Sequence, residues 1–335
     1  MSELNRIALK IISSGKGILA ADESNGTMTK RLEAVNVKSN EENRLKFRKI
    51  LFTSKSMADC IGGVILYDET IRQTFEDKPI PEIISQTGAI TGIKVDTGAK
   101  KLAKSENEKI TEGLDGLRER LKNYYDLGAR FTKWRAVYLI SDQFPSKLAI
   151  DTNAHALARY SALVQEAGMV PIVEPEVLMD GKHSIEDCFN KTSEVIKKCF
   201  DALIFQKIDL KGVILKPNMI LPGSNSNKKY SSEEIANLTL KCLINSVPSE
   251  VPGIAFLSGG QTETEATKNL DTINKLNKSN FIMTYSYGRA LQQSALKHWS
   301  KNTDDADGTQ NIFNHRAKMC SLAALGKWTE QIEKA

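Results

Sequence analysis

The chain has 335 residues, 41% hydrophobic and 26% charged, which is typical of a globular protein with a substantial core. Its 46 basic residues outnumber its 41 acidic residues only slightly and are scattered along the chain, which argues against a nucleic-acid partner. No apolar run approaches the roughly 18 residues that a membrane span requires, and the first residues do not resemble a signal peptide. The 5 cysteines show no CxxC spacing and are expected to be reduced thiols, so we expect a cytoplasmic protein that does not associate with membranes.

Short apolar segments alternate along the chain with segments of helical pattern. The apolar segments are residues 17–23, 62–69, 90–96, 130–138, 170–176, 211–218, 253–259 and 281–288. Strand–helix alternation produces parallel strands, and eight such units predict an α/β fold, a closed (β/α)8 TIM barrel. We expect residues 1–335 to form this single domain, with a short N-terminal helix and a short C-terminal tail. A doubly wound open sheet is the alternative, but its usual GxGxxG motif after the first strand is absent.

Several segments between these strands have the pattern of amphipathic helices. Ser231 lies three residues before Glu234, a capping-box spacing that predicts a helix over 231–246. Further helices are predicted over 153–166, 262–270 and 290–299. The charged segments 40–49 and 113–123 are expected to form solvated helix faces.

Ionisable side chains gather in the C-terminal halves of five of the predicted strands. Residues two apart on a strand share a face, and barrel enzymes place their active sites at the C-terminal ends of the strands. We therefore expect these side chains to converge on one mouth, although each alone could simply reach solvent. They are Asp22, Lys94, Asp96, Lys133, Arg135, Glu174, Glu176 and Lys216.

An amine and two carboxylates at neighbouring strand ends are the components of an imine-forming site. Lys216 follows the most apolar of these segments and is the best candidate nucleophile, because a protein interior lowers the pKa of a lysine. Glu174 and Glu176 would supply compensating charge and proton transfer. Repulsion among Lys216, Lys133 and Lys94 would favour a neutral amine on at least one of them.

Glycine-containing loops follow the last two predicted strands, at 257–261 and 286–289. Glycines let backbone N–H groups approach an anion, and barrels often hold phosphate in these two loops. Arg289 strengthens this prediction. A second anion site is predicted after the first strand, where the residues could alternatively form a capped surface helix: Ser24, Thr27, Lys30 and Arg31.

The histidines show no metal-binding spacing. The 4 histidines are far apart and form neither HxH nor HExxH, so neither a metal site nor a cofactor is expected.

The sequence resembles the class I fructose-1,6-bisphosphate aldolases, the metal-independent Schiff-base type, from about Ile11 to Trp328. Eight stretches in the same order carry the resemblance: GKGILAADES (15–24), CIGGVIL (60–66), GIKVD (92–96), KWR (133–135), VPIVEPE (170–176), LKPNM (215–219), FLSGGQ (256–261) and SYGRALQ (286–292).

This resemblance implies a glycolytic lyase that reversibly cleaves fructose 1,6-bisphosphate to dihydroxyacetone phosphate and glyceraldehyde 3-phosphate. Lys216 matches the imine-forming lysine, and Glu174 matches the acid/base of carbinolamine dehydration, supported by Glu176 and Lys133. Asp22 matches the carboxylate that takes the hydroxyl proton during carbon–carbon cleavage. One phosphate would be bound by Ser258, Gly259, Ser286, Gly288 and Arg289. Residues around the second phosphate or the cavity would be Lys94, Arg135, Ser24, Thr27, Lys30 and Arg31. Family members are usually homotetramers.

Two departures from the family pattern stand out. Thr27 replaces the serine of many members but keeps the hydroxyl. Many animal members end in a tail whose terminal tyrosine helps exchange protons on the enamine, whereas the last tyrosine here is Tyr287. That step is expected to use another group or to run more slowly.

Two other functions remain as alternatives. Another Schiff-base barrel, such as a transaldolase or a deoxyribose-phosphate aldolase, would not need two phosphate sites. A binding or scaffold role alone should tolerate loss of Lys216.

Overall fold

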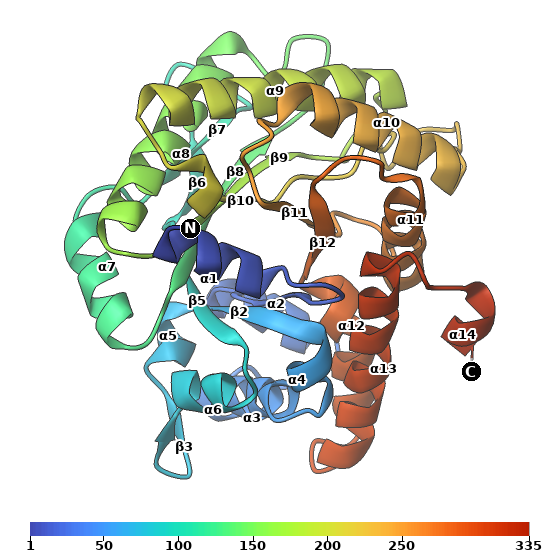
Figure 1. Cartoon of the computed structure of the whole chain (residues 1–335). Helices are drawn as coiled ribbons and strands as arrows, with labels where there is room; N and C mark the ends of the chain where they lie inside the picture. Colours follow the sequence, from blue (N-terminus) through green and yellow to red (C-terminus); the bar gives the residue numbers. More distant parts are fainter. Residues whose placement is uncertain (335) are drawn as a thin grey trace.

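The computed structural model describes residues 1–334, which form a closed barrel of parallel strands surrounded by helices (Figure 1). Each barrel strand pairs with the next one along the chain, and β1 closes the barrel by pairing with β12. The predicted (β/α)8 fold is therefore confirmed. The barrel strands are β1 (Gly17–Ala21), β2 (Ile61–Leu66), β5 (Ile90–Lys94), β8 (Phe131–Tyr138), β9 (Val170–Val177), β10 (Ile214–Leu215), β11 (Gly253–Phe256) and β12 (Ile282–Tyr287).

Helices cover the outside of the barrel, and two small hairpins interrupt the strand–helix alternation (Figure 1). The hairpins are β3 (Thr74–Phe75) with β4 (Lys78–Pro79), and β6 (Gly98–Lys101) with β7 (Lys109–Glu112). The helices are α1 (Glu3–Ile11), α2 (Asn25–Glu33), α3 (Glu41–Phe52), α4 (Ser56–Cys60), α5 (Asp68–Ile71), α6 (Ile80–Gln86), α7 (Leu117–Asp126), α8 (Lys147–Glu166), α9 (Ile185–Phe205), the 3-10 turn η1 (Leu210–Gly212), α10 (Ser232–Ser246), α11 (Glu263–Leu276), α12 (Arg289–Trp299), α13 (Ala306–Ala324) and α14 (Glu330–Lys334).

Side-chain caps set the helix starts. The predicted capping box is present at α10, where the Ser231 side chain accepts from the backbone N–H of Glu234 and the Glu234 side chain accepts from the backbone N–H of Ser231. Helix α8 begins earlier than predicted because Ser146 caps it, accepting a hydrogen bond from the backbone N–H of Ala149. Helix α11 also exceeds its predicted range and continues to Leu276.

The prediction of a strand over 211–218 is wrong in its length, because the observed strand is much shorter. Residues 210–212 form η1, and only Ile214–Leu215 pair as β10. Pro217 has no N–H to donate to a sheet, which helps to end the strand. The backbone N–H of Lys216 still donates to Val173 O at 2.8 Å, so Lys216 remains held beside β9.

Apolar side chains fill the half of the barrel interior that lies next to the N-terminal ends of the strands. Helix α1 lies across the N-terminal ends of the strands (Figure 1) and contributes Ala8 and Ile11 to this cluster, which Ile12 at its C-terminal end also joins. A side chain at inward-facing Gly92 would have its Cβ 2.3 Å from the Phe131 ring, so glycine is required there. The other inward members include Ile18, Ile65, Phe131, Ile172 and Ile214.

The outward faces of the strands pack against the helices in a larger apolar cluster. Val64, Leu215 and Phe256 from the sheet share it with Leu291 and Trp299 from α12, and all five are fully buried. Burial of this kind stabilises the fold by about 25 cal/mol per Å² of apolar surface. Polar side chains on the inward face are found at the C-terminal ends of the strands, beyond the inner apolar cluster.

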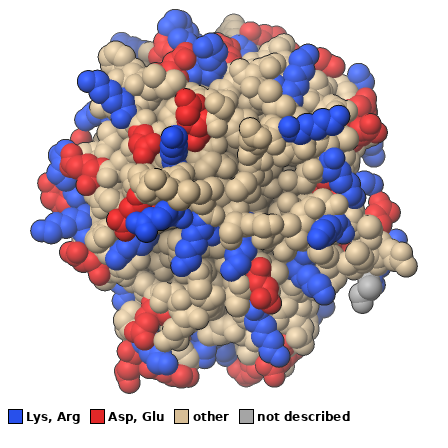
Figure 2. Space-filling model, in the orientation of Figure 1, with Lys and Arg blue, Asp and Glu red and all other residues tan. Residues whose placement is uncertain are grey.

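The surface is charged but mixed in sign. Figure 2 shows basic and acidic side chains interspersed over the face that carries α1. Within residues 1–334, no helix combines the length and the apolar character needed to cross a membrane.

Candidate active site

A cavity of about 560 Å³ opens at the C-terminal ends of the barrel strands. Strand alternation explains its polar lining: the inward face of β8 runs from buried Phe131 to Lys133 and Arg135, and that of β9 runs from Ile172 to Glu174. The structure brings every predicted site residue to this one cavity, namely Asp22, Ser24, Thr27, Lys30, Arg31, Lys94, Lys133, Arg135, Glu174, Glu176, Lys216, Ser258, Gly259, Ser286, Gly288 and Arg289.

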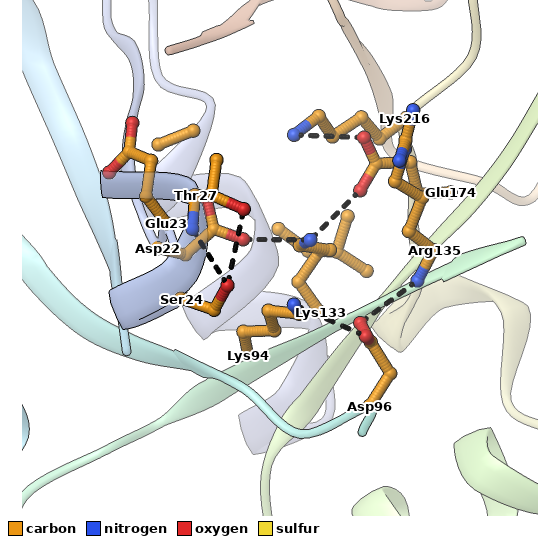
Figure 3. A network of polar contacts seen from close by, with 12 residues as sticks. Asp22, Glu23, Ser24, Thr27, Lys94, Asp96, Lys133, Arg135, Glu174 and Lys216 are labelled. Atoms are coloured by element: carbon orange, nitrogen blue, oxygen red, sulfur yellow. Dashed lines mark hydrogen bonds and ion pairs between the residues drawn. The ribbon is translucent and has the colours of Figure 1, made fainter. Parts of the chain in front are cut away.

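Lysines and carboxylates alternate at the centre of the cavity. Oε1 of Glu174 lies 3.2 Å from Nζ of Lys216, and Oε2 of Glu174 lies 3.3 Å from Nζ of Lys133. Lys133 also contacts Asp22, with Nζ 2.7 Å from Oδ2 (Figure 3). Lys133, Glu174 and Lys216 are each 4% exposed, so these pairs lie almost entirely out of water. Glu174 therefore bridges two lysines, Lys133 on β8 and Lys216 directly after β10.

Opposite charges determine the protonation states in this cluster. Burial by itself would raise the pKa of Asp22, but Lys133 and Lys216 lower it below its ordinary value. Burial likewise opposes ionisation of Glu174, and Lys133 and Lys216 lower its pKa. Burial would lower the pKa of Lys133, whereas Asp22 and Glu174 raise it. The neutral amine expected from repulsion among the lysines is therefore not Lys133, because two carboxylates outweigh that repulsion.

A second set of ion pairs surrounds the central cluster. Nζ of Lys94 lies 3.4 Å from Oδ1 of Asp96, and Oδ2 of Asp96 accepts from the backbone N–H of Arg135 at 3.4 Å. Nε of Arg135 donates to Oε2 of Glu176. Glu176 therefore pairs with an arginine, while Glu174 contacts the lysines.

The loops after β11 and β12 have the features of an anion site. Gly259 and Gly260 have φ values of 28° and 77°, in the left-handed region that favours glycine. Helix α12 begins at Arg289 without a side-chain cap at Gly288, so its first N–H groups are available to a ligand. The hydroxyl of Ser286 is buried and has no hydrogen-bond partner in residues 1–334.

The predicted second anion group lies at the start of α2. Ser24 caps this helix by accepting from the backbone N–H of Thr27 at 3.4 Å, and the two hydroxyl oxygens are 3.1 Å apart. Ser24 therefore caps a helix, as the alternative interpretation predicted, and it also lines the cavity. The strands β1 and β12 are neighbours, which brings Arg31 close to Gly288. Nη2 of Arg31 lies 3.8 Å from the point that a Cβ atom would occupy if residue 288 had a side chain. Arg31 therefore reaches the loop after β12.

The sequence did not identify Glu23 or Arg48 as parts of this region. Glu23 lines the cavity and is bound by Arg31, and its backbone oxygen accepts from Nη2 of Arg48 at 2.8 Å. The expectation that segment 40–49 is a solvated helix face is wrong for Arg44 and Arg48. Both are buried because carboxylates from other segments, including Glu69, pair with them. The one local signal was that Glu23 directly follows Asp22.

Within residues 1–334, no three His, Cys, Asp or Glu side chains are grouped so that they could hold a metal ion.

Known proteins match almost the whole chain. The family model described as "Fructose-bisphosphate aldolase class-I" matches residues 3–335. A probable class 1 fructose-bisphosphate aldolase of Xylella fastidiosa (strain 9a5c) is 48% identical over 330 residues, covering 98% of this chain and 99% of the relative. The cytosolic fructose-bisphosphate aldolase 4 of Arabidopsis thaliana is 49% identical over 326 residues, covering 97% and 83% of the two chains. A solved fructose-bisphosphate aldolase of Plasmodium falciparum superposes with a TM-score of 0.96 at 42% identity, covering 98% of this chain and 95% of that one.

Proposed function

The chain belongs to the class I fructose-bisphosphate aldolase family, and we propose that Lys216 is the residue through which it forms its imine. It is a lyase that reversibly cleaves fructose 1,6-bisphosphate to dihydroxyacetone phosphate and glyceraldehyde 3-phosphate in glycolysis. The observation that supports Lys216 is its 3.2 Å contact with Glu174 in a cluster shielded from water.

In the first step, Glu174 accepts a proton from the ammonium group of Lys216. The neutral amine then attacks the carbonyl carbon of the ketose and forms a carbinolamine. Glu174 returns a proton to the carbinolamine hydroxyl, which leaves as water while the nitrogen lone pair forms the iminium. Lys133 holds the other oxygen of Glu174 and stabilises its anionic form. Glu176 supports this arrangement from its pair with Arg135.

In the second step, Asp22 accepts the proton of the hydroxyl at the bond to be cleaved. The electron pair of the carbon–carbon bond moves into the iminium and produces an enamine, while glyceraldehyde 3-phosphate departs. Protonation of the enamine carbon and hydrolysis of the imine then release dihydroxyacetone phosphate and regenerate Lys216. The imine nitrogen is the electron sink, so we propose that the reaction needs no metal or other cofactor.

Two groups of residues would bind the two phosphates of the substrate. Ser286, Arg289 and the backbone N–H groups around Ser258, Gly259 and Gly288 form the first group. The second group, or its surroundings, comprises Ser24, Thr27, Lys30, Arg31, Lys94 and Arg135. A substrate with two phosphates would use both groups, whereas the substrates of the other Schiff-base barrels would not need two phosphate sites. The two groups therefore favour fructose 1,6-bisphosphate.

We further propose that residues 1–335 act as one domain, in a cytoplasmic homotetramer. The support is the resemblance to the family and, for the location, the relatives named as cytosolic. Sedimentation of the purified chain tests the oligomeric state.

Borohydride reduction in the presence of dihydroxyacetone phosphate, followed by peptide mapping, tests the imine assignment. We expect the trapped adduct on Lys216 and no adduct in Lys216→Arg, because a guanidinium stays protonated at neutral pH. An adduct on Lys133 or Lys94 would show that the assignment is wrong.

A further inference from the structure

A buried ion pair at the edge of the cavity fixes the orientation of Arg31. Glu23 is 7% exposed, and its Oε1 accepts from Nη1 of Arg31. The other end of the guanidinium, Nη2, lies 3.8 Å from the position of a Cβ on Gly288. Oε1 of Glu23 lies at the same distance, 3.8 Å, from that position, so the whole ion pair lies beside the loop after β12, with Nη1 of Arg31 bound to Glu23 and Nη2 left for another acceptor.

Two further side chains, Gln292 and Arg48, hold Glu23 in place. Nε2 of Gln292 donates to Glu23 Oε1 at 3.3 Å and to the Ala20 backbone oxygen at 2.7 Å. The guanidinium of Arg48, which is 1% exposed, lies 3.9 Å from Glu23 Oε2 and donates to the Glu23 backbone oxygen. Groups from α12 and α3 thus fix the Glu23 carboxylate, and Arg48 provides a second positive charge beside it.

The free end of Arg31 lies in surroundings that suit a phosphate group. The uncapped N-terminus of α12, Arg289 and the Ser286 hydroxyl line the same part of the cavity, and that hydroxyl has no hydrogen-bond partner among the described residues 1–334. An arginine can bind two acceptors at once because its donors form a planar fork, which a lysine ammonium does not provide. An arginine that is held in advance also loses less conformational freedom when the phosphate binds.

We propose that Glu23 is a positioning residue for the phosphate site after β12. The resemblance groups Arg31 with residues around the second phosphate or the cavity, but its Nη2 lies beside Gly288. Glu23 binds one end of the Arg31 guanidinium so that the other end faces the phosphate at Gly288. This inference rests on the phosphate site proposed above, but not on which lysine forms the imine.

The decisive experiment is a double-mutant cycle between Glu23 and Arg31. Glu23→Gln is nearly the same size and can still accept from Gln292 and Arg31, but it lacks the charge. The measurement is the competitive inhibition constant of inorganic phosphate against fructose 1,6-bisphosphate. We expect Glu23→Gln to raise this constant about tenfold in the wild-type background. In the Arg31→Ala background the same change should alter it less than about twofold.

Three outcomes would overturn the proposal. An equal effect of Glu23→Gln in both backgrounds would mean that Glu23 acts structurally, without Arg31. A lower inhibition constant in Glu23→Gln would mean that Glu23 competes with phosphate for Arg31. No effect in either background would mean that Glu23 has no role in binding.

A second variant and a control keep the test independent of folding defects. Arg31→Lys keeps the charge but loses the planar fork of donors, and we expect it to bind phosphate nearly as weakly as Arg31→Ala. Inhibition equal to wild type would contradict the proposal.

Glu333→Gln is the matched control, because Glu333 also binds a buried arginine, Arg316, but neither residue lines the cavity. It should leave phosphate inhibition unchanged. Borohydride trapping at saturating dihydroxyacetone phosphate should still label Lys216 in every variant, which separates this test from that of the imine.

Discussion

Oε1 of Glu174 lies 3.2 Å from Nζ of Lys216, so a proton acceptor contacts the proposed nucleophile directly. Strand pairing produces this contact: Lys216 directly follows β10, and its backbone N–H donates to Val173, the residue before Glu174. A proton can therefore move from the amine to the carboxylate without passing through bulk water. The same carboxylate can later return it to the leaving hydroxyl.

Glu174→Gln should slow imine formation by about 10²–10⁴-fold, the usual contribution of a general acid–base catalyst. Glutamine can still contact Lys216 but cannot accept its proton. Rapid-quench borohydride trapping measures the rate of imine formation. Glu176→Gln is the comparison, since Glu176 pairs with Arg135, and it should have a clearly smaller effect. Equal losses in the two variants would argue against a distinct role for Glu174.

Asp22 should stabilise the folded state in a pH-dependent way. Its folded-state pKa lies below the unfolded value of about 3.9, so its contribution is complete above that value and is lost as the pH falls through the folded pKa. At pH 7, Asp22→Asn should destabilise the protein by about 3 kcal/mol, because Lys133 loses one of its buried partners. Denaturant unfolding from pH 7 to pH 3 should show the difference shrinking below about pH 4. A constant difference would contradict the proposed ionisation of Asp22.

Arg289→Ala should weaken phosphate binding. Arg289 is exposed and forms no ion pair with another residue of 1–334, so it is available to the ligand. Loss of one charge-assisted contact costs about 1.5–3 kcal/mol, or roughly ten- to a hundredfold in affinity. Steady-state kinetics should show a much larger rise in KM for the bisphosphate than for an unphosphorylated ketose. An equal rise for both substrates would indicate a structural role instead.

Chelation of divalent metals should leave cleavage intact. The imine supplies the electron sink, so incubation with EDTA should not change kcat beyond experimental error. The coupled assay for triose phosphate measures this. Complete loss of activity in EDTA that zinc restores would reject the imine mechanism.

Deletion of residues 331–335 should leave proton exchange unchanged and reduce stability. Helix α14 lies at the outer edge of the molecule near α11 and α13 (Figure 1). There Glu333 binds Arg316 and accepts from Nε1 of Trp328 at 2.6 Å. We expect a carboxylate of the cavity, Glu174 or Asp22, to exchange protons with the enamine. Since the pKa values of both carboxylates are lowered, the carboxylate would first have to acquire a proton during the reaction.

Tritium exchange from dihydroxyacetone phosphate and thermal unfolding separate the two effects of this deletion. We expect the deletion to lower the melting temperature while exchange, measured well below that temperature, stays at the wild-type rate. Loss of exchange with cleavage preserved would show that the tail takes part in catalysis.

The sequence alone predicted the barrel and most of its cavity, because both depend on short-range patterns. A strand such as 170–176 shows its apolar start and its charged end locally, and the period of two places Glu174 and Glu176 on one face. Once eight strands are counted, the rule that the strand ends meet brings Lys216, Lys133 and Asp22 into one cavity.

The tertiary structure alone decided which charges pair. Glu174 and Glu176 are equivalent in the sequence pattern, yet the barrel places one against lysines and the other against Arg135. Arg48 belongs to a charged helical segment that is expected to face water, but it is buried beside Glu23. Ion pairing depends on distances of a few ångströms between residues far apart in the chain, and burial strengthens each pair by removing water. Local sequence patterns do not determine those distances, so the ion-pair partner of each charge is known only from the closed barrel.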